Sequence, residues 1–351
     1  MRYALLSILT FLSSLTVWAG GGSYWTADGR ERPLRPSGKT FQIPADALAV
    51  LLNASSADGA VFDVDASQAN ANCLFYLNGI DYVPQGLVDR RLVIRDYAIS
   101  DFVVDSRYDY YCPMPFRAET ALFTYTPISE RWGEPKPYMS WTMSGTLVLP
   151  FDAQQVLLTD VNEDMDLNGR PNAIFRYQGE KDNLLNFSMV TERPLKAYEP
   201  YLLRVVPSRV TFYAENTTIP ATRQAMAVGT VFGFVGSTVA QTTTDGYYLW
   251  SDDRQLFYRS ETPESVRPFT AMMAGLDIIF ESDKATDKGE GAYGCLYVDG
   301  FSGENTLAVE VPTRDDDRRP TEVYTLGGQR VCCHSLKPGL YIIGGRKVMV
   351  K

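Results

Sequence analysis

Short runs of β-branched and aromatic residues, separated by clusters of Gly, Pro, Asn and Asp, fill the chain between about residues 60 and 310. No long stretch there shows the 3.6-residue periodicity of an amphipathic helix. Short runs bounded by turn-forming residues are typical of β-strands. The clearest runs are 73–77, 92–94, 102–104, 121–125, 145–149, 201–206, 210–213, 230–235 and 246–250. The pattern predicts an all-β fold, with a β-sandwich body of one or two packed units.

The run from Leu147 to Phe151 makes this prediction specific. Alternate residues of a strand share one face, so Leu147, Leu149 and Phe151 are expected in the core, together with Trp141. The segment 45–52 is the exception to the β pattern. Because it follows Pro44, it fits either a short helix with proline at its first turn or an edge strand.

The N-terminus has the order of a secretory signal. Arg2 precedes an apolar run from Tyr3 to Val17, and a small residue, Ala19, stands at the expected cleavage point. The run is shorter than the ~20 apolar residues that a spanning helix needs. No cysteine follows the cleavage point, which argues against a lipid anchor. We therefore expect cleavage after Ala19, export, and no membrane span in the mature chain.

Composition divides the rest of the chain into segments. The expected segments are a signal peptide at 1–19, a linker at 20–40, an all-β body at 41–311 with a sub-boundary near 129–137, a charged linker at 312–320, and a small C-terminal β-hairpin module at 321–351. The stretch 312–320 has no large apolar side chain, so it can bury little surface. In the C-terminal module two Gly-Gly pairs, 327–328 and 344–345, each lie between strand-like runs, which predicts two hairpins.

Charge and histidine content exclude several function classes. The 33 basic and 42 acidic residues give a net charge of −9, so no nucleic-acid partner is expected. His334, the single histidine, lies in the small C-terminal module, where a catalytic triad or a zinc site is implausible. The acidic segment Asp160–Asn168 resembles the start of a calcium loop. Met165 and Pro171 occupy the positions where that loop needs Gly and Glu, so a solvated loop is favoured over a calcium site.

The remaining candidate groups carry no recognisable chemistry. The five cysteines form no C-x-x-C pair and are interpreted as free buried thiols: Cys73, Cys112, Cys295, Cys332 and Cys333. Five aromatic residues could stack on sugars but are more often core pairs in a sheet: Trp132, Trp141, Trp250, Tyr247 and Tyr248. We predict no catalytic residue, no cofactor-binding residue, no metal ligand and no cofactor.

Two segments resemble parts of exported Bacteroidetes proteins. The residues from Val323 to Val331 and from Leu336 to Lys351, with their Lys-Pro-Gly-Leu-Tyr core, are similar to the C-terminal end that serves in some members as a type IX secretion sorting signal. The body resembles a β-rich region of surface proteins of that phylum, which often follows leucine-rich repeats or adhesin-like modules. The matching pieces are 70–77, 83–87, 111–118, 141–152, 200–203 and 267–269. No leucine-rich repeat, and no other internal repeat, is evident before this region.

The resemblance implies a secreted or cell-surface protein on the exterior of the outer membrane, with the periplasm as the alternative location. It implies no catalytic role. The sequence thus predicts a non-enzymatic structural or adhesion-type protein whose partner is an extracellular protein or a glycan, with the secretion machinery as the partner of the C-terminal module. The alternatives are an extracellular glycan-binding module and a polymer-degrading enzyme.

Overall fold

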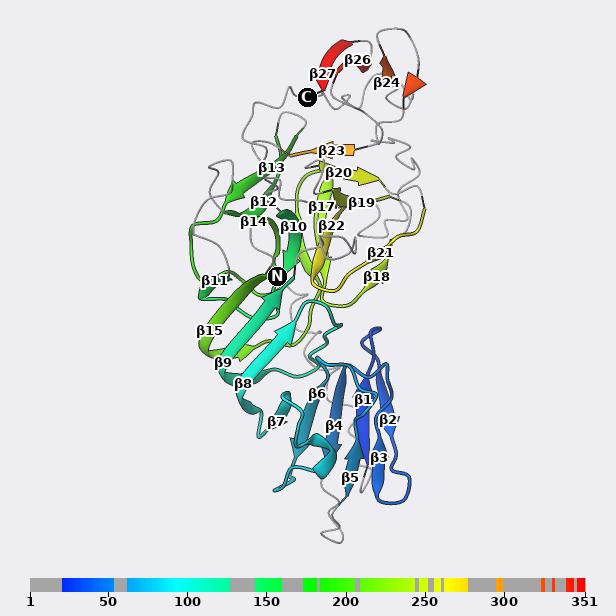
Figure 1. The fold of residues 1–351 in the computed structure, drawn as a ribbon, viewed down its shortest axis with the longest axis vertical. Helices are drawn as coiled ribbons and strands as arrows, with labels where there is room; N and C mark the ends of the chain where they lie inside the picture. Colours follow the sequence, from blue (N-terminus) through cyan, green and yellow to red (C-terminus); the bar gives the residue numbers. More distant parts are fainter. Residues whose placement is uncertain are drawn as a thin grey trace, which may run out of the picture.

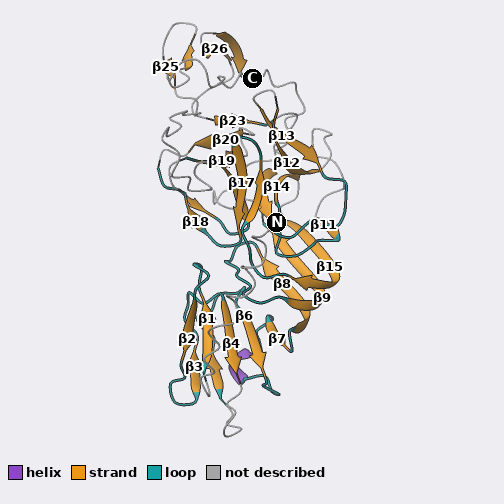
Figure 2. Ribbon diagram, turned by 180° about the vertical axis from the view of Figure 1, so that it is seen from behind, coloured by secondary structure: helices purple, strands orange, loops and turns teal. Residues whose placement is uncertain are grey.

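A computed structural model of the chain is almost entirely β-structure (Figures 1 and 2). The structure describes residues 21–53, 62–126, 143–159, 173–181, 184–205, 209–243, 246–251, 256–259, 262–276, 295–298, 323–325, 330–331, 339–343 and 346–350. Apart from Leu276, at the end of one described range, helix in these ranges is limited to the 3-10 turn η1, Gln85–Leu87. The predicted all-β class is therefore confirmed.

The longest sheet has nine strands in the order β11-β15-β9-β8-β7-β6-β4-β1-β2, and is called here the long sheet. Its strands are β1 (Gly22–Trp25), β2 (Glu31–Leu34), β4 (Ala49–Asn53), β6 (Leu74–Asn78), β7 (Val93–Arg95), β8 (Ala98–Asp105), β9 (Phe116–Tyr125), β11 (Gln155–Thr159) and β15 (Arg209–Ile219). Strands β4, β6 and β7 are parallel, as are β8 and β9, whereas the other neighbours are antiparallel.

The parallel strands stack like the coils of a solenoid. Ala49 of β4 pairs with Leu74 of β6, and Phe75 of β6 pairs with Val93 of β7. On the opposite side of the same coils, β3 (Thr40–Gln42) pairs in parallel with β5 (Asp63–Asp65), and η1 packs beside β5. The apolar space between the two sides holds Phe41, Val50, Val64, Phe75 and Leu87, among others. This arrangement is solenoid-like rather than a clear sandwich, which corrects the predicted sandwich for this part of the chain.

The turn at Gly86 shows how closely these coils approach. A Cβ atom at Gly86 would lie 1.5 Å from the backbone carbonyl oxygen of Val64 in the preceding coil. The Gly86 amide also donates to the Asp63 carboxylate at 3.1 Å. Glycine is therefore required by the close backbone approach, and not by its φ angle.

The N-terminal described segment corrects two predictions. Residues 20–40, predicted to be a linker, contain the antiparallel hairpin β1–β2, in which Trp25 and Leu34 are buried. The segment 45–52 is neither a helix nor an edge strand, because β4 pairs with β1 on one side and with β6 on the other. Burial of alternate apolar side chains on both sides of the sheet outweighs the weak helix preference of the short segment.

Two further sheets complete the body. The central sheet has the order β10-β14-β12-β13, with β10 (Met143–Val148), β12 (Ala173–Lys181), β13 (Leu184–Met189) and β14 (Pro200–Val205). The outer sheet has the order β16-β17-β22-β19-β20-β23, with β16 (Ala225–Val228), β17 (Phe232–Ser237), β19 (Tyr247–Ser251), β20 (Leu256–Arg259), β22 (Thr270–Gly275) and β23 (Cys295–Tyr297). A small ribbon pairs β18 (Gln241–Thr242) with β21 (Ser265–Val266).

The central sheet is apolar on both faces. Leu147, Leu149 and Tyr201 join the core beneath the long sheet, whereas Val148 and Leu202 join the core shared with the outer sheet. A strand covered on both faces is a nearly continuous apolar run, which explains the 145–149 pattern. The predicted burial of Leu147, Leu149 and Phe151 is confirmed, and Trp141 lies outside the described residues.

Hydrogen bonds between distant parts of the chain join these layers. The Ala271 amide donates to the Thr146 hydroxyl at 2.9 Å, which links the outer and central sheets. The Tyr110 amide donates to the Thr238 carbonyl at 3.0 Å, close to the long sheet. The body is thus tied together by contacts between residues that are far apart in sequence.

The C-terminal strands form a sheet of their own, in the order β25-β24-β26-β27. Its strands are β24 (Val323–Thr325), β25 (Arg330–Val331), β26 (Gly339–Ile343) and β27 (Arg346–Val350). The antiparallel pairs β24–β25 and β26–β27 are the two predicted hairpins, and β24–β26 pairing joins them. The predicted linker 312–320 lies outside the described residues.

Candidate binding groove on the long sheet

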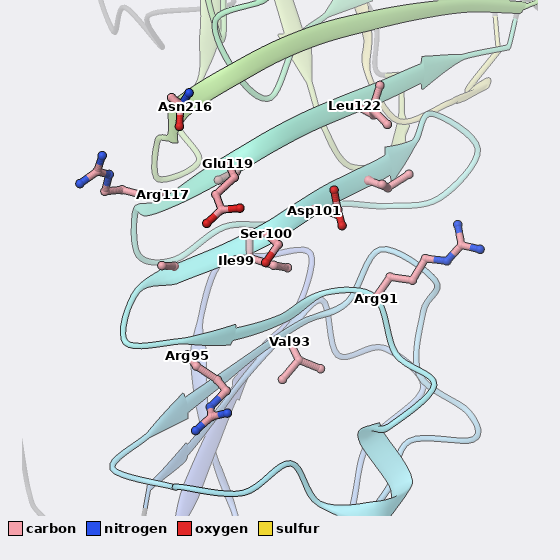
Figure 3. A pocket seen from close by; sticks show the side chains of 13 residues that line it. Arg91, Val93, Arg95, Ile99, Ser100, Asp101, Arg117, Glu119, Leu122 and Asn216 are labelled. Carbon is pink, nitrogen blue, oxygen red and sulfur yellow. The ribbon is translucent and has the colours of Figure 1, made fainter.

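A shallow groove of about 950 Å³ lies on the exposed face of the long sheet (Figure 3). Its walls come from β7 and the residues before it, from β8 and from the first part of β9. Asn216 of β15 completes one side. Four segments separated in sequence therefore build one concave surface.

The groove exists because β7 and β8 separate soon after the turn that joins them. Their only register pair is Arg95 with Ala98, whereas β8 pairs with β9 from Ala98 to Asp105. The connecting turn places Asp96 and Tyr97 at φ angles of +48° and +57°, which L-residues rarely adopt. Two such residues form the tight turn that suits an antiparallel hairpin. Beyond it, the edge of β8 that faces β7 is left open.

A buried amide closes the far end of this opening. Asn72, just before β6, donates from Nδ2 to the carbonyl oxygens of Asp105 and Tyr108, both at 2.8 Å. Its Oδ1 accepts from the Asp105 amide at 3.1 Å. Asn72 is 2% exposed, so these three hydrogen bonds fix the end of β8 against the start of β6. The open edge of β8 therefore runs between the Asp96–Tyr97 turn and Asp105.

Charged side chains are distributed around the groove. Figure 3 shows Arg117 and Arg95 on one side of the hollow and Arg91 on the other, with Glu119 and Asp101 between them. Among the described residues, Arg91 and Arg117 form no ion pair, and Arg95 donates to the Asp81 carbonyl at 3.0 Å. These arginines are exposed, so their guanidinium groups can reach a bound molecule.

Half-buried apolar side chains line the groove between the charges: Val93, Ile99, Val103 and Leu122. Tyr97, in the turn that joins β7 and β8, is 53% exposed but is not one of the residues that line the groove. The chemistry that these side chains offer is apolar contact, hydrogen bonding and charge pairing.

The described thiols are not available for chemistry. Burial raises the pKa of Cys73 to about 12 and that of Cys112 to about 11, so both stay protonated at neutral pH. The Cys112 thiol donates to the Met114 carbonyl at 3.2 Å and contacts the buried Tyr76 hydroxyl at 3.4 Å. The prediction of free buried thiols is confirmed for these two residues. Cys332 and Cys333 lie outside the described residues, and the side chain of Cys295 is not described.

One carboxylate outside the groove serves a structural purpose. Glu180 accepts hydrogen bonds from the Tyr177 hydroxyl at 2.6 Å, from the amides of Thr230 and Phe232 at 2.7 and 2.8 Å, and from two further donors in the same turn. Burial raises the pKa of this carboxyl, but the hydrogen bonds outweigh burial, and the net shift is downward. A Cβ atom at Gly229 would lie 2.6 Å from this carboxylate, so a larger residue there would displace the Glu180 side chain.

This arrangement predicts an acid-sensitive contribution to stability. A carboxyl with a lowered pKa stabilises the fold above its unfolded pKa, near 4.3, and loses that contribution as the pH falls through its folded pKa. We expect Glu180→Gln to lower the free energy of unfolding at pH 7 by about 1–2 kcal/mol, discounted for partial exposure. The difference from wild type should shrink below about pH 4. Urea unfolding at several pH values measures it, with the exposed Glu192→Gln as control, and a difference independent of pH would contradict the assignment.

The structure places the other predicted candidates as follows. Tyr248 is buried, and Trp250 packs edge-on against Phe257 of the neighbouring strand at 5.0 Å between ring centroids, so the core interpretation is confirmed for both. Tyr247 lies on the same strand and is half-buried. The segment Asp160–Asn168, His334 and Trp132 lie outside the described residues.

Two further features concern metal binding and membrane crossing. Within the described residues, no group of three or more His, Cys, Asp or Glu side chains is arranged to hold a metal ion. No described helix has the length and apolar character needed to cross a membrane.

The groove was not predicted from the sequence. Its arginines belong to runs that look like ordinary strand and turn residues, and only the pairing of the strands brings them together. The fold and the groove together define an all-β protein with an open, charged surface hollow. Comparison with protein-family models, with curated proteins and with solved structures finds no match to this chain.

Proposed function

We propose that the chain is an exported, non-enzymatic adhesion-type protein that binds its partner through the groove on the long sheet. The observation that carries this proposal is the set of exposed arginines, Arg91, Arg95 and Arg117, around a hollow with an apolar lining. A surface of this kind offers contact area and charge pairing, which are the elements of molecular recognition.

The strands that carry the groove hold its residues rigidly. The groove residues lie mostly on strands, and the other face of those strands packs on the main core through Phe102, Val104 and Phe116. Sites on strands are held more firmly than sites on loops, so less conformational entropy is lost on binding. The described cysteines, in contrast, are buried and protonated, and serve the fold.

A binding array tests the proposal. The protein from residue 20 onward is applied to immobilised extracellular-matrix proteins and glycans, and bound ligands are compared for wild type and the Arg91→Glu/Arg117→Glu variant. We expect the variant to lose binding to the ligands that wild type captures. The control is Arg30→Glu, which reverses an arginine that is 83% exposed and lies outside the groove. Equal binding by all three proteins would show that the groove is not the recognition surface.

For the C-terminal sheet, we propose that residues 321–351 act as an export address. The charged stretch 312–320 separates them from the body in sequence, and few stabilising contacts are expected across such a linker. Deletion should leave the melting temperature of the body unchanged and retain the protein in the periplasm. A large fall in melting temperature with normal surface display would instead mean that the module completes the body's core.

A further inference from the structure

The open edge of β8 points to a particular kind of occupant. We propose that the groove binds an extended polypeptide segment with acidic side chains, which adds to the edge of β8 as an extra strand. This inference rests on the proposed function, since it names the partner of the same groove. It commits to a polypeptide because a free strand edge offers backbone groups in the spacing of another backbone.

The first step is the direction of the backbone groups on β8. The amide and carbonyl of Asp105 point to the side of the strand where Asn72 lies, because Asn72 bonds both of them. Strand geometry repeats every two residues, so Val103 presents its amide and carbonyl to that same edge. The other edge of β8 is used by β9. In the described residues, no strand pairs with β8 on the open side beyond Ala98.

The second step is the length of the opening. The Tyr97 carbonyl accepts from the Arg117 amide of β9, and the β8–β9 register skips Ser100, so the orientation seen at Asp105 extends back only to Asp101. The stretch from Asp101 to Val104 spans about 13 Å at ~3.3 Å per residue. Natural sheets protect such edges with bulges, charges or covering segments, because an open edge pairs readily with another chain. Asn72 caps one end of this edge and the Asp96–Tyr97 turn limits the other. Between these limits the edge is matched in length to one short extended peptide.

The third step is charge. Arg91, Arg95 and Arg117 outnumber Asp101 and Glu119 around the hollow, in a protein whose net charge is −9. The groove lining thus carries one net positive charge in an acidic chain, and guanidinium groups bind carboxylates in paired geometry. The half-buried Val103 and Leu122 offer apolar contact to side chains between the acidic ones.

The test uses synthetic peptides of about ten residues, a length that spans the opening at ~3.3 Å per residue. One peptide alternates Glu with Val and Thr, a second replaces Glu by Lys, and a third carries N-methyl groups on alternate amides of the Glu sequence. Fluorescence polarisation gives affinity, and amide hydrogen exchange shows which strand is protected. A polygalacturonate oligosaccharide supplies acidic groups without a peptide backbone.

We expect the Glu peptide to bind and to slow amide exchange in β8. The N-methylated peptide and the oligosaccharide should fail to give this protection, because they lack the backbone donors. The Arg91→Ala/Arg117→Ala variant should bind the Glu peptide roughly tenfold more weakly, because two exposed ion pairs are lost. Arg30→Ala should bind as wild type does.

Three results would overturn the inference. These are equal binding of the N-methylated peptide, equal binding of the Lys peptide, or no change in exchange at β8 on saturation. If the Arg91→Glu/Arg117→Glu variant still loses array ligands in any of these cases, the groove remains a recognition surface and only the acidic, strand-forming peptide is wrong as its occupant. If the variant keeps its array ligands, the proposed function falls as well.

Discussion

Phe102→Ala is expected to lower the free energy of unfolding by about 3–5 kcal/mol, the usual cost of deleting a large ring from a packed core. Phe102 is fully buried on β8, with its ring centroid 5.9 Å from that of Tyr110, 5.5 Å from Phe116 and 6.0 Å from Phe151. These rings belong to three separate segments of the chain, so they cannot readily collapse into the cavity. Urea unfolding monitored by tyrosine and tryptophan fluorescence measures the change.

The matched control for this variant is the next residue along the strand. Val103 faces the groove and is half-buried, so Val103→Ala should cost less than about 1 kcal/mol. The contrast between neighbours follows from the alternation of side chains along a strand. Similar costs for the two substitutions would mean that the faces of β8 are wrongly assigned.

Asn72→Ala is expected to lower the free energy of unfolding by about 2–4 kcal/mol, because it removes three part-buried hydrogen bonds worth ~0.5–1.5 kcal/mol each. The three hydrogen bonds of Asn72 join the start of β6 to the end of β8. Their loss should also speed amide exchange at the end of β8 more than in the central sheet. Thermal unfolding and hydrogen exchange measure the two effects.

Asn78→Ala provides the comparison for this effect. Asn78 lies at the other end of β6, is exposed, and donates to the Asn53 side chain at 2.9 Å. An exposed side-chain hydrogen bond exchanges readily for water, so its removal should cost less than about 0.5 kcal/mol. If Asn72→Ala and Asn78→Ala lowered the free energy of unfolding equally, water would replace the Asn72 side-chain amide. Asn72 would then not hold the end of β8 against the start of β6.

The strands themselves were predictable from sequence. The run 102–104 became the centre of β8 and 145–149 became β10, because apolar β-branched and aromatic residues between turn formers favour a half-buried or buried strand. The two C-terminal hairpins were predictable for a related reason: paired glycines between strand-like runs favour tight turns.

The arrangement of the strands was not predictable, because pairing between distant strands leaves no local pattern. The coils β4, β6 and β7 repeat at unequal steps, 25 positions from Ala49 to Leu74 and 18 from Phe75 to Val93, so no fixed period marks them. The β1–β2 hairpin was missed because its Gly, Ser, Arg and Pro content resembles that of a linker, although it buries Trp25 and Leu34.

The groove could not have been found from sequence for the same reason. Arg91 and Arg117 line opposite sides of one groove only because β8 lies between them and diverges from β7. The divergence begins at Asp96 and Tyr97, which both have positive φ angles. Neither residue type is enough to predict that backbone conformation. The arginines carry no signal of their own, since exposed arginine is common on any strand.

The bonds that close the body between distant segments have a consequence for the time the chain takes to fold. The Thr146 hydroxyl meets the amide of a residue 125 positions later, and Asp109 accepts from the Ala240 amide 131 positions later. Chains dominated by such non-local contacts fold slowly, because long loops must close before any contact stabilises them. A slow-folding chain stays unfolded for longer, and an unfolded chain can pass through a translocation channel in an extended state. The same delay leaves its strands unpaired for longer, so, for a chain exported as proposed, we expect a holding chaperone to be needed before translocation.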